Sequence, residues 1–210
     1  MYYIDSPYPI ARINGNSPFK NCIRRWKKGV KEYKSVVFAK KDQNINSIDD
    51  LVGKTIAFEE EFSTGSYALP IASLKNLGYQ FIRTENSTGI TAKTIKYAFS
   101  EDDENTAVWV LKGKVAAGTF SSTNFDKMNL GEKSKLKIVY STIAVPRHMV
   151  CSTKAVSSAD NKMMMSVLQN MHKDAKGQDV LQKFGKTSKF DQFEDEKALM
   201  VTITDLFKNI

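Results

Sequence analysis

The chain has 210 residues, which is enough for one large domain or two small lobes. Its hydrophobic fraction of 41% and charged fraction of 26% are those of an ordinary globular protein and exclude disordered, collagen-like and coiled-coil classes. The net charge of +8 permits nucleic acid, an acidic membrane surface or a small anion as partner. Residues 55–105 carry 4 basic and 8 acidic groups, which argues against one continuous nucleic-acid stripe.

The amino terminus lacks the pattern of a secretory signal, which needs an apolar stretch of about 7–15 residues. Asp5, Pro7 and Pro9 stand where that stretch would be. We therefore expect no signal peptide in this chain. The alternatives are a cytoplasmic protein and a mature or truncated product.

A basic segment runs from Lys20 to Lys34 and carries aromatic residues between its cations. One interpretation is a patch that binds an anion or nucleic acid, with aromatic stacking. The favoured interpretation is a solvated loop or helix face.

The next segments alternate between strand and helix patterns. Ser47 is expected to cap a short helix that ends at Gly53, and Gly78 is expected to end a longer one. This order of elements is typical of a βαβ unit and predicts a parallel sheet covered by helices. The expected strands are 33–39, 54–58 and 79–83, and the longer helix is 67–77.

The pattern continues to the end of the chain, and the class is α/β. We expect Ser157 or Ser158 to cap a helix whose methionines fill the core. The other expected helices are 91–99, 105–111, 121–128, 179–184 and 194–207, and the expected extended segments are 115–119, 136–140 and 148–152.

The turn Ser63-Thr64-Gly65-Ser66 lies between an expected strand and an expected helix. The first amides of a helix lack intrahelical acceptors and carry the positive end of the helix dipole. The hydroxyls can add donors, and the glycine lets the backbone approach a ligand, so the turn can hold a phosphate-like oxyanion. The alternative is simple N-capping by Ser63 or Thr64.

Catalytic and metal sites have little support in the sequence. His148 and His172 lack metal-ligand spacing, and an extended segment would turn His148 and Cys151 to opposite faces. Cys22 and Cys151 can form a disulfide only if the fold brings them together. We expect no enzyme activity, no metal and no cofactor.

Three stretches in the same order carry a resemblance: 33–37, 48–58 and the Ser-Thr turn with Tyr67-Ala68-Leu69-Pro70. They resemble the phosphate/phosphite/phosphonate family of ABC-transporter substrate-binding proteins, which have the two-lobed periplasmic binding fold. The passage Val110–Val115, with its Gly113, and the pair Val145-Pro146 also fit. The similarity covers roughly residue 33 to the end.

The resemblance implies that Ser63 and Thr64 bind oxyanion oxygens together with the amides of Gly65 and Ser66, and that Tyr33 lies near the cleft. The family usually reads Ser-Thr-Ser-Gly, whereas this chain reads Ser-Thr-Gly-Ser. The donors are therefore kept in a changed order.

Other family positions are changed. Asp103 falls where a cleft histidine is expected, while Thr123 and His148 align with positions that carry acids in relatives with amine-bearing ligands. The resemblance therefore disfavours a ligand with an amino group. It leaves a plain oxyanion held by hydroxyls, with His148 or Arg147 as a further contact.

Relatives begin with an additional part of the first lobe, so the expected fold is two-lobed with one lobe incomplete. The expected division is 1–32 as a remnant of lobe 1, 33–143 as lobe 2, and 144–210 as a mostly helical return to lobe 1. The implied function is capture of a small phosphorus oxyanion by lobe closure. The implied partner is an ABC permease and not nucleic acid, in the periplasm or outside the cell. The alternatives are a sensory domain of the same fold and a truncated relative that binds nothing.

Overall fold

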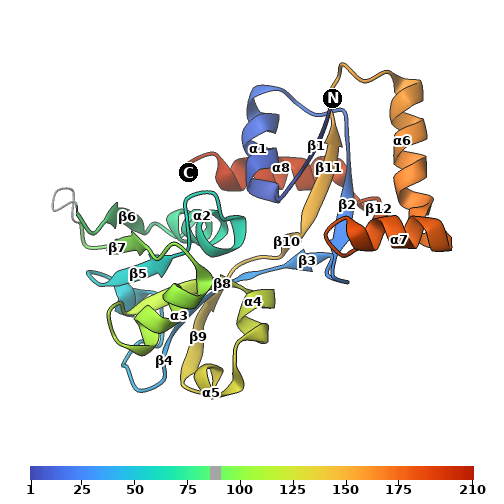
Figure 1. Cartoon of the computed structure of the whole chain (residues 1–210). Coiled ribbons are helices and arrows are strands. Elements are labelled where there is room, and N and C mark those ends of the chain that lie inside the picture. The colour runs from blue at the N-terminus through green and yellow to red at the C-terminus, as the bar shows by residue number, and fades with distance from the viewer. Residues whose placement is uncertain (86–90) are drawn as a thin grey trace. The chain divides into compact units, whose positions relative to one another are not determined.

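The computed structural model describes residues 1–85 and 91–210. The chain forms two compact units (Figure 1). Unit 1 consists of Met1–Tyr33 and Val145–Lys208, and unit 2 consists of Lys34–Ala144 with Asn209–Ile210. The chain therefore passes from unit 1 into unit 2 after Tyr33 and returns after Ala144.

Unit 1 is built on an antiparallel sheet with the strand order β1-β11-β2-β12. Its strands are β1 (Tyr2–Asp5), β2 (Asn21–Lys27), β11 (His148–Ser152) and β12 (Thr187–Asp191). A separate antiparallel pair joins β3 (Glu32–Tyr33) to β10 (Val145–Pro146). The sheet therefore combines strands from both ends of the chain.

Helices cover this sheet: α1 (Pro7–Asn16), α6 (Ser158–Asn170), η3 (Met171–Lys173), α7 (Ala175–Lys183) and α8 (Glu196–Phe207). The core between the sheet and helices α6 and α7 contains Ile23, Val150, Met165, Leu181 and Phe190. Helices α1 and α8 pack together, with the rings of Tyr8 and Phe207 5.4 Å apart.

A disulfide joins Cys22 of β2 to Cys151 of β11. The two residues face each other in the strand register, and both are almost completely buried. Their Cα atoms lie 4.1 Å apart, as in a pair without direct backbone hydrogen bonds. The pairing that the sequence left open is therefore made by the fold.

Unit 2 is built on a six-stranded sheet with the order β6-β7-β5-β8-β4-β9. Its strands are β4 (Ser35–Lys40), β5 (Thr55–Phe58), β6 (Gln80–Arg83), β7 (Thr94–Phe99), β8 (Ala117–Ser121) and β9 (Leu136–Ser141). Strands β6, β7, β5 and β8 run parallel, whereas β4 is antiparallel to both of its neighbours. The expected parallel sheet is thus a mixed one.

The helical elements of unit 2 are η1 (Asp49–Leu51), η2 (Thr64–Ala68), α2 (Leu69–Asn76), α3 (Asp103–Leu111), α4 (Ser122–Lys127) and α5 (Leu130–Lys133). The ring of Phe38 lies 4.7 Å from that of Phe120 and 5.5 Å from that of Phe125. These rings belong to a cluster with Val36 and Val110 that fills the space between the sheet and α3. The α/β class expected from the sequence is confirmed.

The helix expected over residues 91–99 is wrong, because Thr94–Phe99 forms strand β7. The segment reads Thr-Ile-Lys-Tyr-Ala-Phe, and its β-branched and aromatic residues favour strands. Pairing on both sides, with β5 and β6, then stabilises the extended form.

The basic segment from Lys20 to Lys34 consists mainly of two strands joined by a turn at residues 28–31, and it contains no helix. Its first strand is β2, which lies between β11 and β12 in the sheet of unit 1. Arg24 of this strand forms ion pairs with Glu32 at 2.6 Å and with Asp191 at 2.9 Å. Neighbouring acids therefore neutralise this part of the basic segment.

Two further expectations need correction. Of the consecutive methionines in α6, Met165 is buried, whereas Met163 and Met164 are exposed, because adjacent helical residues face different directions. Ser47 does not cap η1. Instead, the Asp50 carboxylate accepts the Ser47 backbone N–H at 2.9 Å.

Candidate functional site

The turn Ser63–Ser66 follows β5 and opens η2, which continues directly into α2. The Ser63 hydroxyl oxygen accepts the backbone N–H of Ser66 at 3.1 Å. This is the N-cap that the sequence offered as the alternative to ligand binding. Capping uses one lone pair of the Ser63 hydroxyl oxygen. The hydroxyl proton and the second lone pair are not required by the cap.

Two neighbouring strands hold this turn by its carbonyl groups. The hydroxyl of Ser35 in β4 donates to the carbonyl oxygen of Gly65. The hydroxyl of Thr119 in β8 donates to the carbonyl oxygen of Ser66 at 2.5 Å. Neither support was predicted from the sequence, although a hydroxyl residue inside an apolar strand could have indicated it.

The open part of the turn is its backbone at Gly65. Ser63 and Gly65 are partly exposed, whereas Thr64 and Ser66 are buried. The Gly65 N–H has no acceptor among the residues that the structure describes. This amide belongs to the first turn of the helix, where the macrodipole is positive, so it can donate to an anion.

Asp103, at the start of α3, lies against the same turn. One of its carboxylate oxygens accepts the Ser66 hydroxyl at 3.3 Å, and the other accepts the side-chain amide of Asn124 at 2.5 Å. Burial raises the pKa of Asp103, and the nearby Glu59 carboxylate raises it further. The turn therefore combines donors for an anion with one carboxylate.

Thr123 lies in the first turn of α4, next to Asn124. The Ser121 hydroxyl oxygen caps this helix by accepting the Asn124 backbone N–H at 3.2 Å. Through Asn124 and Asp103, the structure connects the start of α4 to Ser66. Among the described residues, the Thr123 side chain forms no hydrogen bond with the turn.

The other two candidate residues, Tyr33 and His148, belong to unit 1. The guanidinium carbon of Arg147 lies 5.0 Å from the centre of the Tyr33 ring. Burial and the neighbouring cations lower the pKa of His148 to about 3. His148 is therefore neutral at pH 7, so it can contact a ligand only through a neutral imidazole.

The surroundings of His148 are basic. Arg25 and Arg147 both act on its charge, as does Lys27. The buried Arg25 guanidinium donates to the Thr187 hydroxyl at 2.8 Å, a neutral partner. Within residues 1–85 and 91–210, none of these three cations forms an ion pair. Unit 1 therefore has an uncompensated positive charge of its own.

The described part of the chain holds no group of three or more His, Cys, Asp or Glu side chains placed to bind a metal ion. None of its helices is both long and apolar enough to span a bilayer.

Comparison with known proteins places the chain in a family. A family model described as "ABC transporter, phosphonate, periplasmic substrate-binding protein" matches residues 3–198. The phosphonates-binding periplasmic protein of Escherichia coli (strain K12) is 24% identical over 160 residues. That alignment covers 73% of this chain and 44% of the relative, so the chain spans less than half of that protein.

Solved structures show the same fold. XAC2383 from Xanthomonas citri bound to ATP has a TM-score of 0.87 at 20% identity, covering 99% of this chain and 78% of that one. PhnD1 from Prochlorococcus marinus (MIT 9301), in complex with methylphosphonate, has a TM-score of 0.63 at 19% identity. That match covers 99% of this chain and 77% of PhnD1.

Two α/β units connected by two passages of the chain are the two-lobed fold of periplasmic binding proteins. The chain belongs to the family of periplasmic substrate-binding proteins of phosphonate ABC transporters.

Proposed function

We propose that this chain binds a small phosphorus oxyanion, namely phosphate, phosphite or a phosphonate, at the Ser63–Ser66 turn. The observation that carries the proposal is the Gly65 N–H at a helix start, which has no acceptor among the described residues and is flanked by the hydroxyls of Ser63 and Thr64. Oriented amides and hydroxyls bind oxyanions without a metal. Family membership supports the same ligand class.

Two relatives support an anionic ligand. PhnD1 from Prochlorococcus marinus was solved with methylphosphonate, and XAC2383 from Xanthomonas citri was solved with ATP. The uncompensated cations of unit 1 favour the same sign of charge. We propose that the protein acts by binding alone, as the substrate-binding component of an ABC importer, with a membrane permease as its partner.

In this proposal the two units act as lobes that close over the ligand, a common binding-protein motion. The two passages of the chain, after Tyr33 and after Ala144, would then be the hinge. We place the protein in the periplasm or outside the cell. The Cys22–Cys151 disulfide supports this location, because disulfides persist mainly in oxidising compartments.

Asp103 would make the proposed site selective among oxyanions. A carboxylate beside bound oxygen atoms repels a fully ionised oxyanion but accepts a hydrogen bond from a P–OH group. A phosphate or phosphonate monoanion has such a group, whereas sulfate at neutral pH does not. The site should therefore prefer a protonated phosphorus oxyanion to sulfate.

Calorimetric titration with phosphate, phosphite and methylphosphonate tests the proposed function. We expect saturable binding of at least one of them to the folded, oxidised protein at pH 7. The absence of binding heat with all three, at several temperatures and with the fold verified by circular dichroism, would contradict the proposal.

The Asp103→Asn substitution tests whether Asp103 causes this preference for a protonated phosphorus oxyanion over sulfate. Removing the carboxylate charge should strengthen sulfate binding by about tenfold or more at pH 7, because juxtaposed like charges cost several kcal/mol. Since the pKa of Asp103 is raised, wild-type affinity for sulfate should increase as the pH falls through that pKa. Titrations with sulfate between pH 4 and pH 8 measure this slope, and Asp103→Asn should abolish it. Equal sulfate binding and equal pH profiles in both proteins would refute the role of Asp103.

A further inference from the structure

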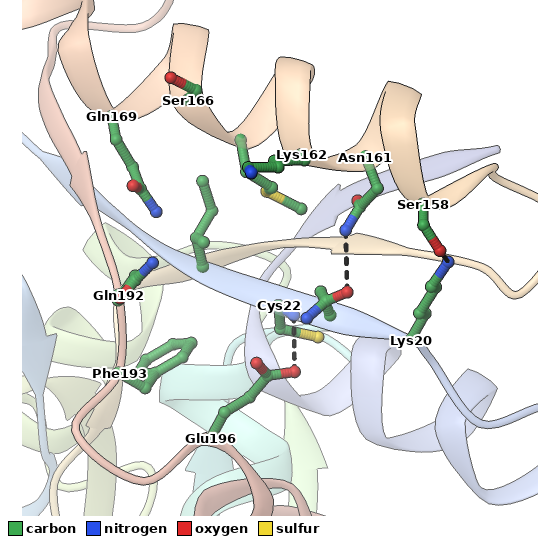
Figure 2. A pocket seen from close by; sticks show the side chains of 13 residues that line it. Lys20, Cys22, Ser158, Asn161, Lys162, Ser166, Gln169, Gln192, Phe193 and Glu196 are labelled. Atoms are coloured by element: carbon green, nitrogen blue, oxygen red, sulfur yellow. Dashed lines mark hydrogen bonds between the residues drawn. The ribbon is translucent and has the colours of Figure 1, made fainter.

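Unit 1 contains a pocket of about 590 Å³ beside strand β2. Its walls come from β2, α6, the segment after β12 and the start of α8 (Figure 2). Strand β12 pairs with β2 only from Arg24 to Lys27, so the edge of β2 at Asn21–Ile23 opens into the pocket. Pockets of this size hold small molecules, and this one uses no residue of unit 2.

Two amide side chains of α6 line the pocket, and each has one buried polar atom without a hydrogen-bond partner among the described residues. Asn161 is 7% exposed, and its nitrogen donates to the Asn21 side-chain oxygen at 2.8 Å. Its own oxygen has no partner, and neither has the buried side-chain nitrogen of Gln169, among the residues described. The pocket therefore offers one acceptor and one donor that a peptide group complements.

The pocket also has three charged side chains without an ion-pair partner among the described residues: Glu196, Lys162 and Lys20, whose ammonium group donates to the neutral Val156 carbonyl oxygen and Ser158 hydroxyl. One oxygen of the half-buried Glu196 carboxylate accepts the Cys22 N–H at 2.7 Å, as Figure 2 shows. Burial raises the pKa of Glu196, and its carboxylate has no ion-pair partner in the described part of the chain. Lys162 on α6 has no acid partner there either. A ligand with one positive and one negative end would compensate the charges of Glu196 and Lys162, while Lys20 keeps its neutral partners.

The length of the polar wall indicates the length of the ligand. Asn161 and Gln169 are eight residues apart on α6, which is about 12 Å along the helix axis. An extended chain of three residues spans about 10 Å. The side chains of Ile23, Met165 and Phe193 add apolar surface between the polar groups.

We propose that this pocket binds a short peptide of two or three residues with free termini. The peptide ammonium group lies at Glu196, and its carboxylate lies at Lys162. Its main-chain N–H and C=O groups pair with the Asn161 oxygen and the Gln169 nitrogen. This site is independent of the proposed oxyanion turn, since the two share no residue.

Calorimetric titration of the full, oxidised chain with triglycine and trialanine at pH 7 tests the proposal. We expect both to bind, and Glu196→Gln to weaken binding about tenfold or more through loss of the charge. The glutamine oxygen can still accept the Cys22 N–H, so the local fold is kept. Glu194→Gln is the matched control, because Glu194 is exposed and does not line the pocket. It should leave binding unchanged.

A blocked ligand identifies which end of the peptide contacts Glu196. N-acetyl-triglycine lacks the ammonium charge, so it should bind the wild type as weakly as triglycine binds Glu196→Gln. The affinity of N-acetyl-triglycine should be little lower for Glu196→Gln than for the wild type. The absence of binding by triglycine and trialanine would overturn the proposal. So would equal affinity of triglycine for the wild type and Glu196→Gln, or equal affinity of the blocked and free peptides for the wild type.

Discussion

Reduction of the Cys22–Cys151 disulfide should lower the free energy of unfolding of unit 1 by about 2–5 kcal/mol. The cross-link joins residues 129 positions apart, and the loop that it closes contains all of Lys34–Ala144. Without it, the unfolded chain gains the loop-closure entropy of that long segment. For a unit of about 100 residues, a change of this size lowers the midpoint of thermal unfolding by roughly 10 °C or more.

Calorimetric scans with and without dithiothreitol measure this effect. The double variant Cys22→Ala, Cys151→Ala is the control, and its unfolding should not respond to the reductant. A second transition, assigned to unit 2, should move less, because the described part of that unit has no cysteine. Identical scans of oxidised and reduced wild type would show that the disulfide contributes no stability.

The double substitution Ser63→Ala, Thr64→Ala should weaken binding of the phosphorus oxyanion by about 100-fold or more. Each lost hydrogen bond to a charged group contributes roughly 1.5–3 kcal/mol, and 1.4 kcal/mol corresponds to a factor of ten. Titration with whichever of phosphate, phosphite and methylphosphonate binds the wild type gives the comparison. An affinity within threefold of wild type would contradict the assigned role of these hydroxyls.

Matched variants separate ligand contact from helix capping. Ser63→Ala also removes a cap, which costs about 1 kcal/mol of stability. Ser63→Asp keeps a capping acceptor but places a negative charge at the site, so it should abolish binding while the thermal midpoint stays near that of wild type. Ser134→Ala, which removes an exposed hydroxyl elsewhere in unit 2, should change neither property.

The position of the Ser63–Ser66 turn could be predicted from the sequence because its signals are local. A strand pattern, a run of hydroxyl residues with Gly65, and an apolar helix pattern follow one another within a few residues. Such patterns determine caps and turns almost without help from the rest of the chain. The cap at Ser63 follows from them directly.

What supports the turn could not be predicted in the same way, because it depends on strand order. Ser35 and Thr119 lie far from Gly65 in sequence and meet the turn only after β4, β8 and β5 are assembled. The pairing of Cys22 with Cys151 likewise depends on the register of β2 and β11. Local patterns do not contain this information.

Strand β7 was predicted as a helix, because its strand structure depends on pairing with its neighbours rather than on its local sequence. The spacing of apolar residues in 91–99 was compatible with a short helix, yet neighbours on both sides made it a strand. Short apolar segments are ambiguous in this way until their partners are known. The same holds for the basic segment, since its place inside a sheet depends on strands from the other end of the chain.

The central claim is that a phosphorus oxyanion binds at the helix start of unit 2. Amide chemical shifts of the isotope-labelled chain during titration with methylphosphonate test it residue by residue. The claim predicts saturable shifts that are largest at the N–H groups of Gly65, Ser66 and Tyr67. Saturable shifts that leave these three amides unchanged, or no shifts at millimolar ligand, would contradict it.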